Sequence, residues 1–121
     1  MILSQIFRIT GVASDEIEDA GITSTEKEKK RIVGVGLQVT GYAGNDVKSY
    51  HERTKIFEIP DTMIDLEATA FNTDLSKPGP RMTYKEVGLD LPVGETFNVS
   101  IKCGATNHNL IGYYDYELIG G

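Results

Sequence analysis

The stretch that decides the fold is Leu89–Ile119, LDLPVGETFNVSIKCGATNHNLIGYYDYELI. Its middle part, Thr96–Cys103, alternates strictly between polar and apolar side chains. This period of two is typical of a strand with one buried face and one face in water. Turn-forming residues at 104–109 separate it from a second run, Leu110–Ile119, which is dense in aliphatic and aromatic residues. We therefore predict that these two runs form an antiparallel hairpin.

Strand patterns also occur earlier in the chain. Residues 2–12 (ILSQIFRITGV) have the β-branched content of a strand. Residues 32–42 (IVGVGLQVTGY) alternate between two faces, one with Val33, Val35, Leu37 and Val39, the other with Gly34, Gly36, Gln38 and Thr40. The two glycines leave the second face nearly flat, which indicates that a backbone or a large side chain lies over it. A tight-turn signal at 43–46 leads into 47–59, and we predict a second long hairpin there.

Two segments have a less regular pattern. Residues 13–31 begin acidic and end basic, and we expect an exposed charged loop or arm with one short helical turn at either charged end. We predict no core residues within 15–28. Residues 61–80 fit both strand and helix spacing, so a helix there stays open, and 81–87 predict a short strand.

The whole pattern comprises about seven or eight strands, with turn signals every 8–12 residues or so and no helix longer than two turns. It predicts an all-β fold, either a β-sandwich or a barrel, with a single domain over residues 1–121. A parallel α/β fold is excluded because the crossover helices that it requires are missing.

Composition narrows the classes of function. The net charge is −6 and the pI is near 4.8, which disfavours direct nucleic-acid binding. No apolar run approaches the ~20 residues that cross a bilayer, and the first eight residues lack the features of a signal peptide. We therefore expect a protein made in the cytoplasm that does not bind membranes. The single cysteine, Cys103, allows no internal disulfide.

No motif predicts catalysis, a metal site or a cofactor. His51 is expected within a strand and His108 in a turn, without the spacing of a metal site. The acidic run at 15–19 lacks the order of an EF-hand loop, and a solvated loop is the better interpretation. Cys103 is expected on the apolar face of its strand, where a thiol packs as a small hydrophobe and is a poor nucleophile. We expect a protein that is not an enzyme.

Three tyrosines within four residues are the one unusual feature. Alternation predicts that Tyr114 and Tyr116 cover the core, while Tyr113 lies on the opposite face with Ile111 and Ile119. Tyrosine is favoured at protein interfaces because it combines a large area with a polar tip. We predict a subunit interface made of this second face and the flat face of the earlier strand, comprising Ile111, Tyr113, Ile119, Gly34 and Gly36. The alternative is that the 61–80 segment covers this face.

The phrases LPVGETFNVSI (91–101) and LIGYYDYEL (110–118), joined by a polar loop, resemble the closing strands of small single-jelly-roll structural proteins of viruses and phages, such as capsid and decoration proteins. This resemblance implies a jelly-roll-like antiparallel β-sandwich and a subunit that works by assembling, for example within a virion. The chain lacks a basic arm, unlike capsid proteins that bind genomes directly.

The leading hypothesis is a non-enzymatic structural subunit that binds copies of itself, or a larger protein scaffold, in a symmetric oligomer or shell. Rings of three or five copies are plausible for a jelly roll. The alternative is a small ligand-binding β-sandwich, such as a carbohydrate-binding module, with ligand contacts at Asn107, His108 and Asn109 and at exposed tyrosines. The lack of tryptophan counts against this alternative.

Overall fold

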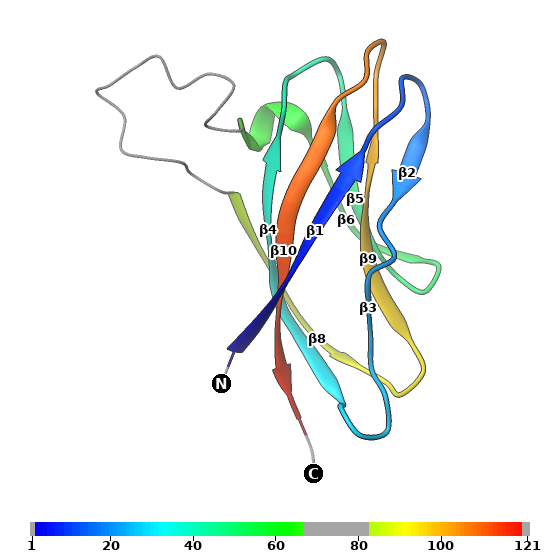
Figure 1. Cartoon of the computed structure of the whole chain (residues 1–121), viewed down its shortest axis with the longest axis vertical. Helices are drawn as coiled ribbons and strands as arrows, with labels where there is room; N and C mark the ends of the chain where they lie inside the picture. The colour runs from blue at the N-terminus through cyan, green and yellow to red at the C-terminus, as the bar shows by residue number, and fades with distance from the viewer. Residues whose placement is uncertain (1, 67–82, 120–121) are drawn as a thin grey trace, which may run out of the picture.

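Two sheets pack face to face in the computed structural model, which describes residues 2–66 and 83–119 (Figure 1). Sheet A contains, in spatial order, β1 (Ile2–Thr10), β10 (Asn109–Leu118), β4 (Lys30–Val39) and β8 (Thr83–Leu91), with the short β7 (Asp65–Leu66) parallel to one end of β4. Sheet B contains β2 (Glu16–Glu18) and β3 (Ile22–Thr23), then β9 (Thr96–Lys102), β5 (Asp46–His51) and β6 (Thr54–Pro60). A single 3-10 turn, η1 (Asp61–Met63), follows β6.

The antiparallel pairs of the two sheets are nested along the chain. The first strand pairs with the last, β2 and β3 together pair with β9, β4 pairs with β8, and β5 pairs with β6. If β2 and β3 are counted as one interrupted strand and the two-residue β7 is left aside, eight strands form two four-stranded sheets in the order of a jelly roll. The predicted all-β, jelly-roll-like sandwich is confirmed.

Both predicted hairpins are wrong, although their strands exist. β9 and β10 belong to different sheets, and so do β4 and β5. Each of these strands has one apolar face, and such faces can be buried across the sandwich as well as side by side. The turn-forming residues at 104–108 therefore carry the chain from one sheet to the other. The predicted 47–59 run is itself a hairpin, in which β5 and β6 are joined at Glu52 and Arg53.

The core lies between the sheets. β10 contributes Tyr114, which is fully buried, and its ring packs edge-on against Phe97 of β9 with centroids 6.0 Å apart. Close approach within sheet A requires glycine at 112, because a Cβ there would lie 1.9 Å from the carbonyl oxygen of Gly36. The buried apolar side chains come from both sheets: Phe7, Ile9, Ile22, Ile32, Val35, Leu37, Val39, Val47, Ile64, Leu91, Phe97, Val99, Ile101, Cys103, Leu110 and Tyr114.

Residues 13–31 differ from the prediction of an exposed loop. β2 and β3 lie along β9 as the margin of sheet B, and neither predicted helical turn forms (Figure 1). Ile22 is 3% exposed and belongs to the core, while Ile17 packs against it. The prediction of no core residues within 15–28 is therefore wrong. Each strand contributes only one apolar side chain, which is too little for a periodic pattern.

The predicted face of β4 is right in part. Val35, Leu37 and Val39 are fully buried, but the pairings of β4 with β10 and with β8 both shift between Ile32 and Gly34. This bulge turns Ile32, rather than the predicted Val33, into the core. The question of a helix at 61–80 falls largely on residues 67–82, which lie outside the described part of the chain.

A buried polar cluster holds the crossing from β4 to β5 in place. The Asp61 carboxylate accepts hydrogen bonds from the backbone N–H groups of Ala43 and Asn45, at 2.8 and 3.0 Å, and from the Asn45 side chain at 2.9 Å. Asn45 also accepts a hydrogen bond from the Gly104 N–H at 3.1 Å. The two crossings between the sheets are therefore tied to each other at one end of the sandwich, and the buried side-chain polar atoms of this cluster all have hydrogen-bond partners.

Candidate interaction surface on sheet A

The outward face of sheet A follows from the alternation of β10. Leu110 and Tyr114 point into the core, so Ile111 and Tyr113 point outward. Tyr113 is paired in register with Ile6 of the neighbouring β1, and Phe7 next to it is buried. Ile6 is 75% exposed, the highest value among the large hydrophobic residues described. An aliphatic and an aromatic side chain thus lie side by side on this surface.

The other side of this surface is formed by β8. Gly36 of β4 is paired with Tyr113 on one side and with Tyr84 of β8 on the other. The Tyr84 and Tyr113 rings are tilted by 39° with centroids 6.4 Å apart. Tyr84 is 41% exposed. We call the surface made of Ile6, Tyr84, Ile111 and Tyr113 the aromatic face of sheet A.

A row of hydrogen bonds crosses the four main strands of sheet A on this face. The Tyr84 ring lies over Gly34, where a Cβ would come within 2.4 Å of its hydroxyl oxygen. That hydroxyl donates to one carboxylate oxygen of Asp115 at 3.0 Å, and Ser4 of β1 donates to the other at 2.6 Å. The prediction that a large side chain lies over the glycines is confirmed at Gly34. The row fixes Tyr84 flat on the sheet before any partner binds, which reduces the entropy that binding would cost.

The environment of Tyr84 also shifts its acidity. Partial burial of the phenol and its hydrogen bond to the Asp115 carboxylate raise the pKa of Tyr84 to about 12. The phenol therefore stays a hydrogen-bond donor over the whole physiological pH range, and the aromatic face keeps one arrangement there.

Of the five residues predicted for the interface, four lie on this surface. Ile111 and Tyr113 face outward on β10, and Gly34 and Gly36 form the β4 backbone beside them. Ile119 lies beyond the end of β10, and its N–H donates to the carbonyl of Lys29 at 2.8 Å. The sequence prediction missed Ile6 and Tyr84, since their place depends on which strands flank β10 and β4.

The residues predicted as alternative ligand contacts are engaged within the protein. The side chain of Asn107 accepts a hydrogen bond from the Ala13 N–H at 2.6 Å. The His108 ring lies against Gly41, where a Cβ would be 2.5 Å from its Cε1, and its Nε2 is 3.0 Å from the Thr106 hydroxyl. The exposed Asn109 lies at the start of β10, with its N–H bonded to Thr40. These contacts hold the loop between β9 and β10.

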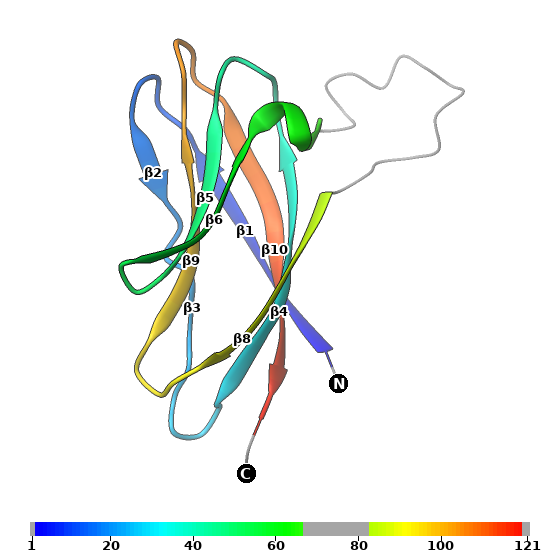
Figure 2. The same cartoon turned by 180° about the vertical axis from the view of Figure 1, so that it is seen from behind.

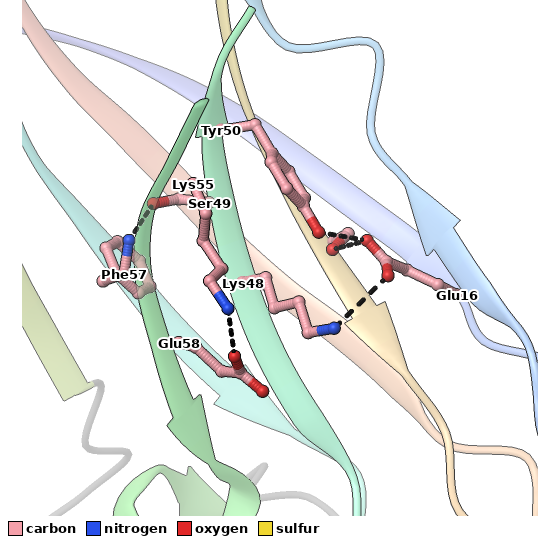
Figure 3. A network of polar contacts seen from close by, with 8 residues as sticks. Glu16, Lys48, Ser49, Tyr50, Lys55, Phe57 and Glu58 are labelled. Atoms are coloured by element: carbon pink, nitrogen blue, oxygen red, sulfur yellow. Dashed lines mark hydrogen bonds and ion pairs between the residues drawn. The ribbon is translucent and has the colours of Figure 1, made fainter. Parts of the chain in front are cut away.

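The outward face of sheet B is polar by comparison. Figure 3 shows Glu16 of β2 at the centre of a network, where it accepts hydrogen bonds from Tyr50 at 2.8 Å and Ser100 at 2.9 Å and lies 3.5 Å from the Lys48 ammonium. Burial opposes ionisation of Glu16, but these hydrogen bonds and the lysine charge outweigh it, so the pKa of Glu16 is lowered. A shallow groove beside the network is lined by Glu16, Ile17, Glu18, Tyr50, Glu52 and Arg53.

The remaining titratable candidates have structural environments. His51 ends β5 instead of lying mid-strand as expected, and its Nε2 lies within hydrogen-bond distance of the Glu95 carboxylate. Cys103 is 2% exposed in the core, as predicted. Within residues 2–66 and 83–119, no group of three or more His, Cys, Asp or Glu side chains is placed to hold a metal ion.

No known protein family, curated protein or solved structure matches this chain. In the described part of the chain, no helix is long and apolar enough to cross a membrane.

Proposed function

We propose that this protein is a non-enzymatic structural subunit that assembles with copies of itself through the aromatic face of sheet A. The observation that carries the proposal is the exposure of Ile6 next to Tyr113, on a sheet surface whose tyrosine Tyr84 is already fixed. A partner that covers this face would remove apolar area from water, and each buried side chain of this size contributes about 1.5–3 kcal/mol when fully covered.

The composition of the face supports a protein partner. It combines two tyrosines and two isoleucines with a charged margin, Arg8 on β1 and Asp115 on β10. Protein interfaces are enriched in aromatic residues at the centre and polar at the rim. Arg8 and Asp115 have opposite signs, so two copies can meet without opposing like charges.

The jelly-roll strand order is compatible with this class of protein. Jelly rolls occur in viral capsid proteins, in lectins and in cupins, so the fold alone does not choose among them. The sequence resemblance to viral and phage structural proteins favours the first class. We therefore propose a symmetric oligomer or shell, with a virion or a larger protein scaffold as its setting.

Two substitutions test the aromatic face. Tyr113→Glu and Ile6→Glu each place a charge where the proposal requires apolar contact, and both should lower the mass measured by light scattering while the far-UV CD spectrum keeps its β-sheet shape. Ile56→Glu is the matched control, because Ile56 is 39% exposed on β6 of sheet B. If all three substitutions lowered the mass equally, or if none of them lowered it, the role of this face would be refuted.

A second candidate function rests on the groove of sheet B. Its Tyr50 lies among the carboxylates of Glu16, Glu18 and Glu52 and the guanidinium of Arg53, a set that can stack on and hydrogen-bond a small polyhydroxylated ligand. This candidate predicts a monomer that binds glycans on an array, and loses that binding in Tyr50→Ala. A defined oligomer without glycan binding would exclude it.

A further inference from the structure

β1 is an unprotected edge strand of sheet A. It pairs with β10 over nine residues without a bulge, and within residues 2–66 and 83–119 no strand pairs with its other edge (Figure 1). It contains no proline, lysine or acidic residue, and Arg8 is its only charged side chain. Proteins normally protect such edges with prolines, charges or bulges, because unpaired N–H and C=O groups bind other strands.

The other margins of the sandwich are protected in these ways. β6 carries the Lys55–Glu58 ion pair and ends at Pro60. The pairing of β8 shifts register around Gly88, whose φ is +64°, and the strand carries the exposed charged residues Lys85, Glu86 and Asp90. The edge formed by β2 and β3 is broken between two short strands. In Figure 2, β6 and β8 lie toward the viewer, and β1 lies behind them. β1 therefore lacks the protection that the other edges have.

We propose that β1 pairs antiparallel with β1 of a second copy, about a two-fold axis through Ile6, so that the two A sheets form one continuous sheet. This inference rests on the proposed self-assembly, since the partner is another copy of the chain. The register centred on Ile6 pairs all nine residues of the strand, from Ile2 opposite Thr10 to Thr10 opposite Ile2. By the alternation of antiparallel ladders, it would add about eight to ten backbone hydrogen bonds.

The side chains favour the same register. It places Ile6 opposite Ile6 and so extends the aromatic face across the two-fold axis. It places Arg8 of the second copy opposite Ser4, whose hydroxyl donates to Asp115 on the next strand. Because neighbouring strands are about 4.8 Å apart, an arginine side chain can reach a carboxylate two strands away. Arg8, the only charged residue of β1, thus meets Asp115 of the other copy, and the two-fold axis repeats this contact.

Disulfide trapping tests both the edge and the register. Directly opposite residues of an antiparallel pair have Cα atoms about 4.5–5.5 Å apart, which suits a disulfide. Ile6→Cys should therefore give a covalent dimer under mild oxidation, seen as a band of twice the chain mass on a non-reducing gel. The native Cys103 is buried and should not react. Ile6 is 75% exposed, so its substitution should leave the fold intact, which far-UV CD checks.

Four further variants make the result specific. Ile56→Cys places an exposed thiol on the protected β6 edge and should stay monomeric on the gel. Ser4→Cys and Arg8→Cys should each cross-link much more slowly than Ile6→Cys, while the double variant should cross-link well, because residue 4 faces residue 8 in this register. Equal cross-linking of Ile6→Cys and Ile56→Cys would overturn the proposal.

The same experiment separates this inference from the proposed function. If the wild-type protein is oligomeric and Ile6→Cys fails to cross-link, the β1 pairing is wrong and the self-assembly stands. If the wild-type protein is a monomer at every concentration and Ile6→Cys fails to cross-link, both are wrong.

Discussion

Substitution of Tyr114 by phenylalanine tests how the two sheets are joined. The Tyr114 hydroxyl donates to a carboxylate oxygen of Asp19 at 2.8 Å and accepts the N–H of Val99 at 3.2 Å. It therefore links β10 of sheet A to β9 and to the segment after β2 in sheet B. Burial of the phenol and its bond to Asp19 raise the pKa of Tyr114, so the hydroxyl remains protonated up to strongly alkaline pH.

The loss of stability follows from the interactions that phenylalanine keeps and those that it removes. Phenylalanine keeps the ring contacts with Phe7 and Phe97, whose centroids are 4.9 and 6.0 Å from that of Tyr114. It leaves the buried N–H of Val99 without this partner, whereas Asp19 still accepts from the N–H of Gly21 at 2.8 Å. An unsatisfied buried donor costs ~1–3 kcal/mol. We expect the free energy of unfolding to fall by about 2 kcal/mol, which for this chain length lowers Tm by roughly 8 °C.

Thermal and urea unfolding followed by CD measure this change. Tyr116→Phe is the matched control, since it removes a hydroxyl two residues along the same strand, where no described residue hydrogen-bonds to it, and it should leave Tm nearly unchanged. If Tyr114→Phe and Tyr116→Phe have the same Tm, the hydroxyl of Tyr114 does not join the sheets and this account of the core is wrong.

Two more predictions concern stability. Ile22→Ala should lower the free energy of unfolding in urea by about 2–5 kcal/mol, because it opens a cavity in the core, and a loss below 1 kcal/mol would mean that β3 does not pack as described. Stability should also fall as pH rises from 10 to about 12, because the unfolded chain loses the Tyr84 proton near pH 10.0 while the folded chain keeps it up to about 12. Tyr84→Phe should make this fall less steep, and an unchanged slope in alkaline urea titrations would contradict the hydrogen bond from Tyr84 to Asp115.

Strand positions could be predicted from the sequence because the alternation of side chains is local. The run Thr96–Cys103 and the N-terminal run were recognisable without knowing their neighbours. Which strands pair with each other depends on the whole chain. Two consecutive strands with apolar faces can lie side by side in one sheet or in the two opposite sheets of the sandwich. The turn formers at 104–108 are compatible with both, which is why β9 and β10 were expected to pair with each other.

β2 and β3 show where a periodic pattern is too short to detect. Glu16 and Glu18 flank a single inward residue, Ile17, and Ile22 stands alone between Gly21 and Thr23. The segment is charged as a whole, so composition predicted a loop, while its backbone completes the margin of sheet B along β9.

The candidate surface was predictable to the extent that it depends on one strand. Alternation along β10 was sufficient to place Tyr113 and Ile111 on its outer face. Ile6 and Tyr84 join them only because β1 and β8 flank β10 and β4, and no local signal in the sequence carries that information. The Asp115 carboxylate accepts hydrogen bonds from Ser4 and Tyr84 and orders that face, and this role also depends on the two flanking strands.

The most direct test of self-assembly is the mass of the wild-type protein in solution, measured by light scattering after size exclusion over a range of concentrations. The chain mass is 13.3 kDa. We predict a discrete species at an integer multiple of that mass, and a lower mass for Tyr113→Glu. A wild-type protein that stays at 13.3 kDa up to the highest concentration would contradict the proposal that it is an assembling subunit.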